Sequence, residues 1–223
     1  MDNLLLSELA QKLKIAPLNI LREEAEMLIL HNMAEEPFSK NIIFYGGTAL
    51  RLAYDCPRFS EDLDFLMVHP VKEAELKVAL EKTIEQESGL SLADLKDKRN
   101  TLFALLKLKS PLLKHALSIK IEIARRENGI KREFRPLASP CSPLQPVLYT
   151  ATLDSLEKAK LRALKERNTP RDWFDAYYIA ALLRKPVSFP AKFDQDKVEF
   201  KRELKRFLPR DKWKLIDELL KSL

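Results

Sequence analysis

GGTALRLAYDCPRFSEDLDF, residues 46–65, holds two features around which the rest of the sequence is arranged: a glycine pair at its start and a D-x-D motif near its end. The apolar run NIIFY (41–45) before the glycines predicts a short buried strand, and TALRLAY (48–54) after them predicts a short helix. The D-x-D motif opens DLDFLMV (62–68), whose alternation predicts a second strand. This order of elements indicates an α/β core.

The two aspartates of the D-x-D motif are candidate metal ligands. Asp62 and Asp64 stand two residues apart in a strand, so both carboxylates project from one face of the sheet. In LSIKIEIA (117–124) isoleucines alternate with polar residues, and pairing of this strand beside 62–68 would bring Glu122 next to the aspartates. Three such carboxylates repel one another unless a cation lies among them, and Mg²⁺ prefers carboxylate and phosphate oxygens. The pattern predicts a site for one or two Mg²⁺ ions.

The glycine pair is a candidate phosphate site. Where a strand gives way to a helix, backbone N–H groups and the positive helix end face an anion, and a glycine leaves room for a phosphate to approach. By itself a Gly-Gly is mostly a turn, and a D-x-D pair is usually two solvated side chains, so the prediction rests on their combination with the later carboxylate. The candidate residues for holding a nucleoside triphosphate are Gly46, Gly47, Thr48, Arg58 and Ser60.

Further elements flank this core. Residues 18–34 show apolar side chains at helical spacing, a second helix is expected between Pro70 and Glu87, and residues 101–109 join 117–124 as strand candidates. Residues 126–150 contain four prolines and no periodicity, which predicts a linker.

Beyond residue 150 the pattern turns helical. One helix is expected to run to Arg167, another from Thr169–Pro170 to Leu183, and two more follow. The expected fold class is therefore α/β, of the α+β type, with a small mixed sheet, flanking helices and a C-terminal helical lobe. The predicted domains are a core with an N-terminal helix, a Pro-rich linker and the helical lobe, at residues 1–125, 126–150 and 151–223.

Composition excludes several classes of protein. With 46% hydrophobic residues, 32% charged residues and 4 glycines, the chain is neither disordered nor fibrous. No apolar run approaches the roughly 20 residues that cross a bilayer, and Asp2 and Glu8 precede the first cation, unlike a signal peptide. Cys56 and Cys141 form no metal or disulfide pattern, and the histidines are scattered. We expect a cytoplasmic protein with no membrane contact.

The net charge of +6 is unevenly distributed, because residues 126–223 contain 22 Lys and Arg against 14 Asp and Glu. A basic half suits a polyanionic substrate, since its field attracts phosphates. Five cations near the C-terminus are candidates for RNA phosphate contacts: Lys197, Lys201, Arg202, Lys205 and Arg206. The plainer alternative is that they coat a helix whose apolar residues, Phe200, Leu204 and Phe207, pack inward.

The run from Gly46 to Phe65 closely resembles the signature of the nucleotidyltransferase AbiEii/AbiGii toxin family, a branch of the DNA polymerase beta-like nucleotidyltransferases. AKLRALKERNTPRDWFD, residues 159–175, resembles the family's second block, while 117–125 resemble it weakly and the last forty residues not at all. One departure is that Gly-Gly rather than Gly-Ser opens the first motif. Whether Thr48 or Ser60 supplies a hydroxyl to the phosphate therefore stays open.

The resemblance implies a Mg²⁺-dependent enzyme that moves a nucleoside monophosphate from an NTP to a hydroxyl acceptor. By likeness, Asp62 and Asp64 bind the metal, Glu122 is the third acidic strand position, Lys160 contacts the triphosphate and Asp175 is a late carboxylate of the catalytic set. The family also implies a toxin, acting in a toxin–antitoxin or abortive-infection system, with a cognate antitoxin and with RNA, tRNA first, as the acceptor.

Other interpretations stay open. A small-molecule nucleotidyltransferase of the aminoglycoside-modifying kind would share the core, and a non-catalytic RNA-binding module would need only the basic lobe. In the second block, Lys160, Arg167 and Arg171 could share one face of a continuous helix. More plainly, Asp172 could satisfy a helix N-terminus and Asp175 could pair with Arg171, four residues before it.

Overall fold

The computed structural model describes residues 1–125, 129–190 and 192–223. A mixed sheet of seven strands, in the order β3-β4-β5-β2-β1-β7-β6, forms its centre. The strands are β1 (Ile42–Tyr45), β2 (Asp62–Met67), β3 (Leu90–Lys98), β4 (Thr101–Leu108), β5 (Leu117–Ala124), β6 (Arg132–Pro136) and β7 (Val147–Ala151). The helices are α1 (Asn3–Leu13), α2 (Pro17–Glu35), α3 (Gly46–Ala53), α4 (Glu73–Gln86), α5 (Leu153–Glu166), α6 (Pro170–Leu182), α7 (Lys197–Lys205) and α8 (Lys214–Ser222). The α/β fold class is confirmed.

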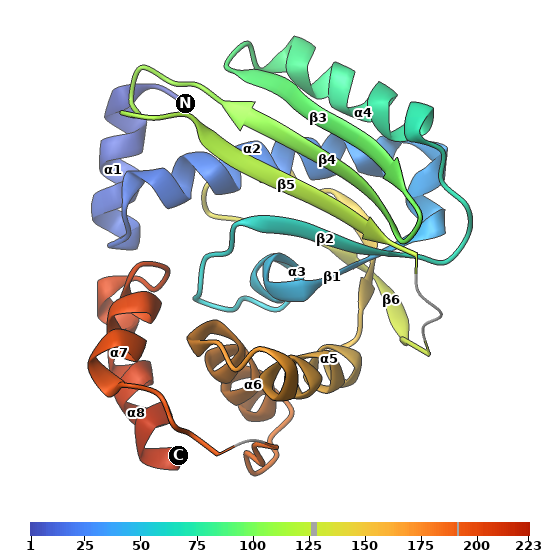
Figure 1. Cartoon of the computed structure of the whole chain (residues 1–223). Coiled ribbons are helices and arrows are strands. Elements are labelled where there is room, and N and C mark those ends of the chain that lie inside the picture. The colour runs from blue at the N-terminus through green and yellow to red at the C-terminus, as the bar shows by residue number, and fades with distance from the viewer. Residues whose placement is uncertain (126–128, 191) are drawn as a thin grey trace.

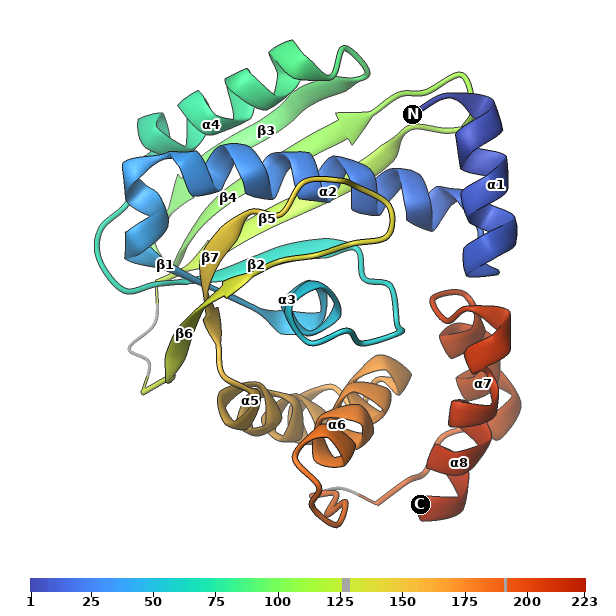
Figure 2. The same cartoon turned by 180° about the vertical axis from the view of Figure 1, so that it is seen from behind.

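The helices divide between the two faces of the sheet. Helices α2 and α4 lie behind the long strands β3, β4 and β5 in Figure 1 and in front of them in Figure 2, so they cover one face. None of the described helices lies over the opposite face of these three strands in Figure 1. Helix α3 lies beside β1 and β2, and α5 and α6 pack beyond it.

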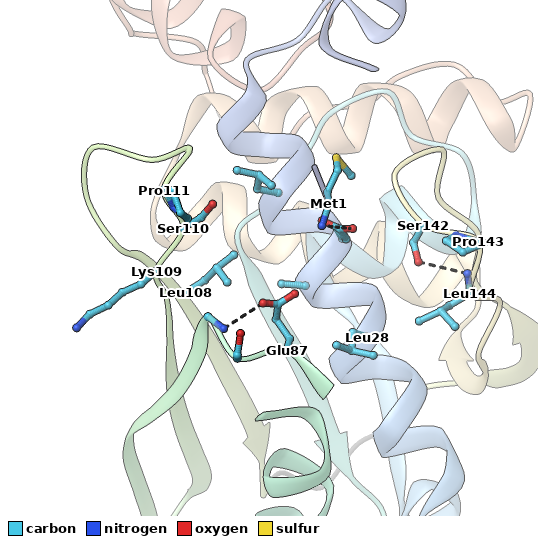
Figure 3. A pocket seen from close by; sticks show the side chains of 15 residues that line it. Met1, Leu28, Glu87, Leu108, Lys109, Ser110, Pro111, Ser142, Pro143 and Leu144 are labelled. Carbon is cyan, nitrogen blue, oxygen red and sulfur yellow. Dashed lines mark hydrogen bonds and ion pairs between the residues drawn. The ribbon is translucent and has the colours of Figure 1, made fainter. Parts of the chain in front are cut away.

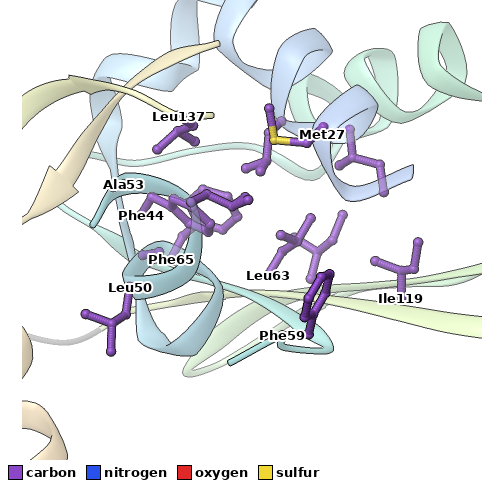
Figure 4. Packing of buried hydrophobic residues seen from close by; sticks show 14 of the residues in the cluster. Met27, Phe44, Leu50, Ala53, Phe59, Leu63, Phe65, Ile119 and Leu137 are labelled. Atoms are coloured by element: carbon purple, nitrogen blue, oxygen red, sulfur yellow. The ribbon is translucent and has the colours of Figure 1, made fainter. Parts of the chain in front are cut away.

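The buried core lies under α2. Along β2 the apolar residues alternate with the aspartates, so Leu63 and Phe65 are fully buried while Asp62 and Asp64 reach the other face. Phe65 packs against Phe44 of β1 with ring centroids 5.0 Å apart and ring planes tilted by 31°, and Met27 of α2 lies over this region (Figure 4). The same alternation that builds the core therefore presents the carboxylates.

The predicted linker is wrong in part, because residues 132–136 and 147–151 are strands β6 and β7 of the sheet. Strand β7 pairs parallel with β1 and antiparallel with β6, which is the edge strand. Pro136 ends the edge strand, where a missing N–H costs no ladder bond, and the other prolines lie between the two strands. Strands of only five residues are too short to show a period. Residues 126–128 of the predicted linker lie outside the described residues, and the division into domains stays a prediction.

The predicted helices after residue 150 are present, but the first two are not continuous. Helix α5 ends at Glu166, Asn168 adopts a left-handed φ of 47°, and Pro170 opens α6. The turn separates Lys160 from Arg171, so the predicted stripe along one continuous helix does not form. None of the helices in the described ranges is long and apolar enough to span a bilayer.

Candidate nucleotide and metal site

The three predicted carboxylates lie on two neighbouring strands. Strands β2 and β5 pair in parallel, with Asp62 opposite Lys120 and Asp64 opposite Glu122. Paired residues point to the same face, so Asp62, Asp64 and Glu122 share the face opposite α2. The sequence-based prediction that β5 brings Glu122 beside the aspartates agrees with this register.

Lys120 lies inside this carboxylate group. Its Nζ is 3.4 Å from Oδ2 of Asp62 and 3.6 Å from Oε2 of Glu122. Burial alone would lower the pKa of Lys120, but the charges of Asp62 and Glu122 outweigh burial and raise it. The alternation of apolar and polar residues in 117–124 predicted that Lys120 lies on this face. Its ion pairs with Asp62 and Glu122 depend on the pairing of β5 with β2, which the sequence alone does not show.

The surroundings of Asp64 raise the pKa of its carboxyl group. Burial and then the charge of Asp62 raise the pKa of Asp64 to about 6, against the opposing charge of Lys120. The Asp62 and Glu122 side chains are 42% and 39% exposed, so the group opens to solvent on one side. A further positive charge would relieve the remaining repulsion, and the donors are all hard oxygens.

This donor set fits a divalent cation in its chemistry. Within the ranges that the structure describes, however, no three His, Cys, Asp or Glu side chains are gathered closely enough to hold one metal ion. Binding a metal at Asp62, Asp64 and Glu122 therefore requires these side chains to close in, with Lys120 giving up a carboxylate partner.

Gly46 brings the start of α3 against the D-x-D motif. It adopts a φ of +86°, which favours glycine, and a Cβ at this position would stand 2.7 Å from Oδ2 of Asp64. A Cβ at Gly47 would stand 2.5 Å from Nη2 of Arg58 and 2.8 Å from Oγ of Ser60. Gly46 thus lies against the predicted metal ligand Asp64, and Gly47 lies against Arg58 and Ser60, which the sequence predicted to surround the phosphates.

The two candidate hydroxyls differ in their surroundings. The Thr48 hydroxyl is buried and donates to the backbone oxygen of Asp62 at 2.5 Å, which ties α3 to β2. Ser60 is half-buried beside Gly47. Ser60 is therefore the better placed of the two to meet a phosphate, while Thr48 has a structural role.

Arg58, Lys160 and Asp175 form a buried ion cluster next to the glycine pair. Arg58 donates from Nε and Nη2 to the two carboxylate oxygens of Asp175, at 2.7 and 2.8 Å, and Lys160 Nζ lies 2.7 Å from Oδ2 of Asp175. Burial would raise the pKa of Asp175, but the charges of Arg58 and Lys160 lower it. Asp175 pairs with these two cations rather than with Arg171, so its plainer pairing is wrong.

Asp172 completes the cluster from the first turn of α6. Its carboxylate accepts from Arg167 at 2.7 and 2.8 Å, from the Thr169 hydroxyl at 2.7 Å and from Lys160 at 3.2 Å. Burial opposes ionisation, yet the hydrogen bond from Arg167 and the charge of Lys160 lower the pKa of Asp172 to about 2. Lys160 is thus fixed by one aspartate from each of the first two turns of α6.

Glu61 links the D-x-D strand to the C-terminal helices, a contact that the sequence did not predict. Its carboxylate lies 3.1 Å from Nη1 of Arg22 on α2 and 3.3 Å from Nη1 of Arg171 on α6. Arg171 in turn reaches Glu203 of α7 at 3.4 Å. No local spacing signals these contacts, because the partners come from four separate elements.

The C-terminal cations lie on α7, whose inner face is apolar. Phe200, Leu204 and Phe207 are buried as the plainer alternative expects. Lys201 pairs with Asp217 at 2.6 Å, and Arg202 pairs with Glu199 at 2.5 Å. Two of the five cations therefore have anionic partners, while Lys205 lies over the Trp213 ring and Arg206 over the Phe207 ring.

A cavity of about 370 Å³ lies elsewhere in the molecule (Figure 3). It is lined by α2, the turn between α4 and β3, the end of β4 and residues 142–144. Met1 and Glu24 form an ion pair in it, with their atoms 3.4 Å apart. None of the predicted site residues lines this cavity.

Residues 28–221 match the family model of the nucleotidyl transferase AbiEii toxin, type IV TA system. The chain belongs to this family. The family resemblance of residues 46–65 is thereby confirmed, as is the expectation of a nucleotidyltransferase. An AbiEii-family toxin has an antitoxin partner and an NTP substrate, and nucleotidyltransferases of this family generally use a divalent metal.

Three solved structures share the fold of this AbiEii-family chain. JHP933 from Helicobacter pylori is 24% identical, with a TM-score of 0.57 over 75% of this chain and 68% of that one. A second H. pylori protein, assigned to the nucleotidyltransferases, is 23% identical, with a TM-score of 0.58 over 93% and 84%. MenT4, a nucleotidyltransferase toxin of Mycobacterium tuberculosis, is 17% identical, with a TM-score of 0.57 over 91% and 68%. No curated protein matches the chain.

Proposed function

We propose that this AbiEii-family enzyme moves a nucleoside monophosphate from an NTP to a terminal hydroxyl of RNA, with tRNA the first candidate, and releases pyrophosphate. Its metal is Mg²⁺, and its place of action is the cytoplasm, where NTPs and tRNA are found. The observation that carries the proposal is the register of β2 with β5, which sets Asp62, Asp64 and Glu122 on one open face beside the start of α3.

The carboxylates have two tasks in this proposal. Asp62, Asp64 and Glu122 would hold Mg²⁺, which when bound neutralises phosphate charge and orients the reacting oxygens. Asp64 or Glu122 accepts the proton of the attacking hydroxyl. Without a bound cation, burial and the charge of Asp62 raise the pKa of Asp64 to about 6, so a cation held at this carboxylate group would stabilise its ionised form.

The triphosphate lies against the other half of the site. The backbone N–H groups at the start of α3 face its oxygens, with Ser60 beside them. Lys160 neutralises charge on the leaving pyrophosphate. Its ammonium lies near the carboxylate group, since its charge lowers the pKa of Asp64. Arg58 is a nucleotide-binding candidate whose guanidinium is oriented by Asp175, so Asp175 acts by positioning.

A transfer assay tests this function. Purified protein is incubated with Mg²⁺, total tRNA and each of the four α-labelled NTPs in turn, and label in RNA is counted. We expect incorporation from at least one NTP that disappears when EDTA is added or RNA is omitted. Label that appears in a small molecule with RNA unchanged would instead indicate a small-molecule acceptor. Absence of transfer to either acceptor would contradict the proposal.

A further inference from the structure

The open face of β3, β4 and β5 is continuous with the carboxylate group. The register of the strands sets one row of paired residues across the sheet, Asp64, Glu122 and Phe103, with Lys96 at its outer end. Because paired residues point to the same side, Phe103 lies next to Glu122 on the face without a helix. At about 4.8 Å between strands, Phe103 is roughly 10 Å from Asp64 across the sheet.

The residues of strand β4 alternate between the buried core and the open face. Its even-numbered residues, Leu102 to Leu108, are buried under α2 and α4, whereas its odd-numbered residues are half-exposed. Phe103 and Leu105 are therefore apolar side chains on a surface that needs none for packing. Lys98 extends over Phe103, with Nζ 4.6 Å from the ring centroid.

Three lysines lie on the same face as this aromatic ring, two of them next to it on β3 and the third four residues along β4. Lys96 and Lys98 are both exposed, and the Lys107 ammonium donates a hydrogen bond to the Ser118 hydroxyl on the same face. The one acidic residue that β3 adds to this face is Asp94, which pairs with Lys96. Beyond the carboxylate group itself, the open face of the described strands is thus positive and carries an aromatic ring.

We propose that the single-stranded end of the acceptor RNA lies across this face, with a base stacked on Phe103 and phosphates against Lys96, Lys98 and Lys107. The inference rests on the proposed function, because it requires an RNA acceptor. Single-stranded RNA is commonly bound by aromatic side chains on an open sheet with cations around them. The path leads directly to the carboxylates, so the terminal hydroxyl arrives at Asp64 and Glu122.

This inference moves the acceptor away from the C-terminal cations. Lys201 and Arg202 of α7 have anionic partners, and no row of paired residues joins them to the carboxylates, whereas Phe103 pairs directly with Glu122. At physiological salt, where distant charges are screened, reversing Lys201, Arg202 and Lys205 to Glu should therefore weaken RNA binding much less than Phe103→Ala does, which makes this triple variant a comparison for the face.

The test measures binding of a short 5′-labelled single-stranded RNA with a free 3′ hydroxyl, by fluorescence anisotropy, to Phe103→Ala and Phe103→Leu. Both should weaken binding by about 5- to 150-fold, the range for one stacked base, while NTP binding by calorimetry stays unchanged. Phe103→Trp should keep the affinity, and its added fluorescence should be quenched by RNA. Phe134→Ala is the matched control, since Phe134 is an exposed aromatic residue on the edge strand β6.

The outcomes separate this inference from the proposed function. If the wild type modifies RNA and Phe103→Ala binds and modifies it equally well, the face is not the acceptor site, although the enzyme still acts on RNA. An effect of Phe134→Ala as large as that of Phe103→Ala would also overturn the inference. If Phe103→Ala loses binding of the cognate antitoxin but keeps binding of RNA, the face is a protein interface and not the acceptor site. If the wild type neither binds nor modifies RNA, both proposals fail.

Discussion

Gly46 is the residue at which backbone conformation and site geometry meet. Its positive φ lets the chain turn sharply from β1 into α3, and the missing side chain lets Asp64 lie against the turn. A side chain at this position would therefore strain the backbone and also meet the Asp64 carboxylate.

Replacing Gly46 by Ala should therefore reduce both stability and activity. The new Cβ strains the backbone and displaces the Asp64 carboxylate, so we expect a loss of about 1 to 3 kcal/mol in the free energy of unfolding and a loss of nucleotide transfer. Chemical denaturation and the transfer assay measure the two effects. Gly129→Ala is the control, because a Cβ there meets nothing within 4 Å. Wild-type activity in Gly46→Ala would show that the approach to Asp64 is not needed.

Asp64 should destabilise the metal-free protein at neutral pH. Because its pKa is raised in the folded state to about 6, ionising Asp64 destabilises the folded protein. This cost is absent below about pH 4 and fully present well above pH 6. In EDTA at pH 7.5, Asp64→Asn should raise the free energy of unfolding by about 1 to 2 kcal/mol, less than the ~3 of two full pKa units because the side chain is partly solvated. The gain should vanish near pH 4. Glu85→Gln, on an exposed turn of α4, is the control, and a gain independent of pH would refute the charge explanation.

At the scale of elements, α5 and α6 act as one unit around buried charges. Lys160 of α5 is held by Asp172 and Asp175 of α6, and Arg58 from the loop before β2 closes the same cluster. A buried charge without its partner costs far more than an exposed one, so these residues fix the turn between the helices as well as the cations.

Lys160→Ala should reduce transfer by about 10² to 10³, since one positioned charge at the leaving group is lost. Each aspartate keeps another partner, Arg58 or Arg167, so the free energy of unfolding should fall by only about 1 to 3 kcal/mol. Rates are measured well below the melting temperature to separate the two effects. Lys158→Ala, exposed two residues earlier, should change neither rate nor stability. Equal losses in both variants would indicate bulk charge instead of a positioned lysine.

The elements differed in how well the sequence predicted them. Strands β2, β4 and β5 alternate over six or more residues, so their faces could be predicted. Strands β6 and β7 have five residues each and lie among prolines, so only tertiary pairing reveals them. The ion pairs of Asp175 and Glu61 were missed for the same reason, because their partners are distant in sequence and spacing carries no signal of them.

At the scale of the whole molecule, the candidate site lies where the sheet meets the C-terminal helices. Asp62, Asp64 and Glu122 come from the sheet, and Lys160 comes from α5. Glu61, through Arg22 and Arg171, joins the start of β2 to α2 and α6. The family and its chemistry could be predicted from residues 46–65, whereas this assembly depends on contacts between parts of the chain more than 100 residues apart.

The central claim is that the carboxylates on β2 carry out nucleotide transfer, and the most direct measurement is the transfer rate of Asp62→Ala and Asp64→Ala with α-labelled NTP, Mg²⁺ and tRNA. Both variants should remain folded by circular dichroism, because removing one of several like charges relieves repulsion. Each should lose transfer by far more than tenfold. If both kept activity within about tenfold of the wild type, a loss of only ~1.4 kcal/mol in transition-state stabilisation, these carboxylates would not be the catalytic centre.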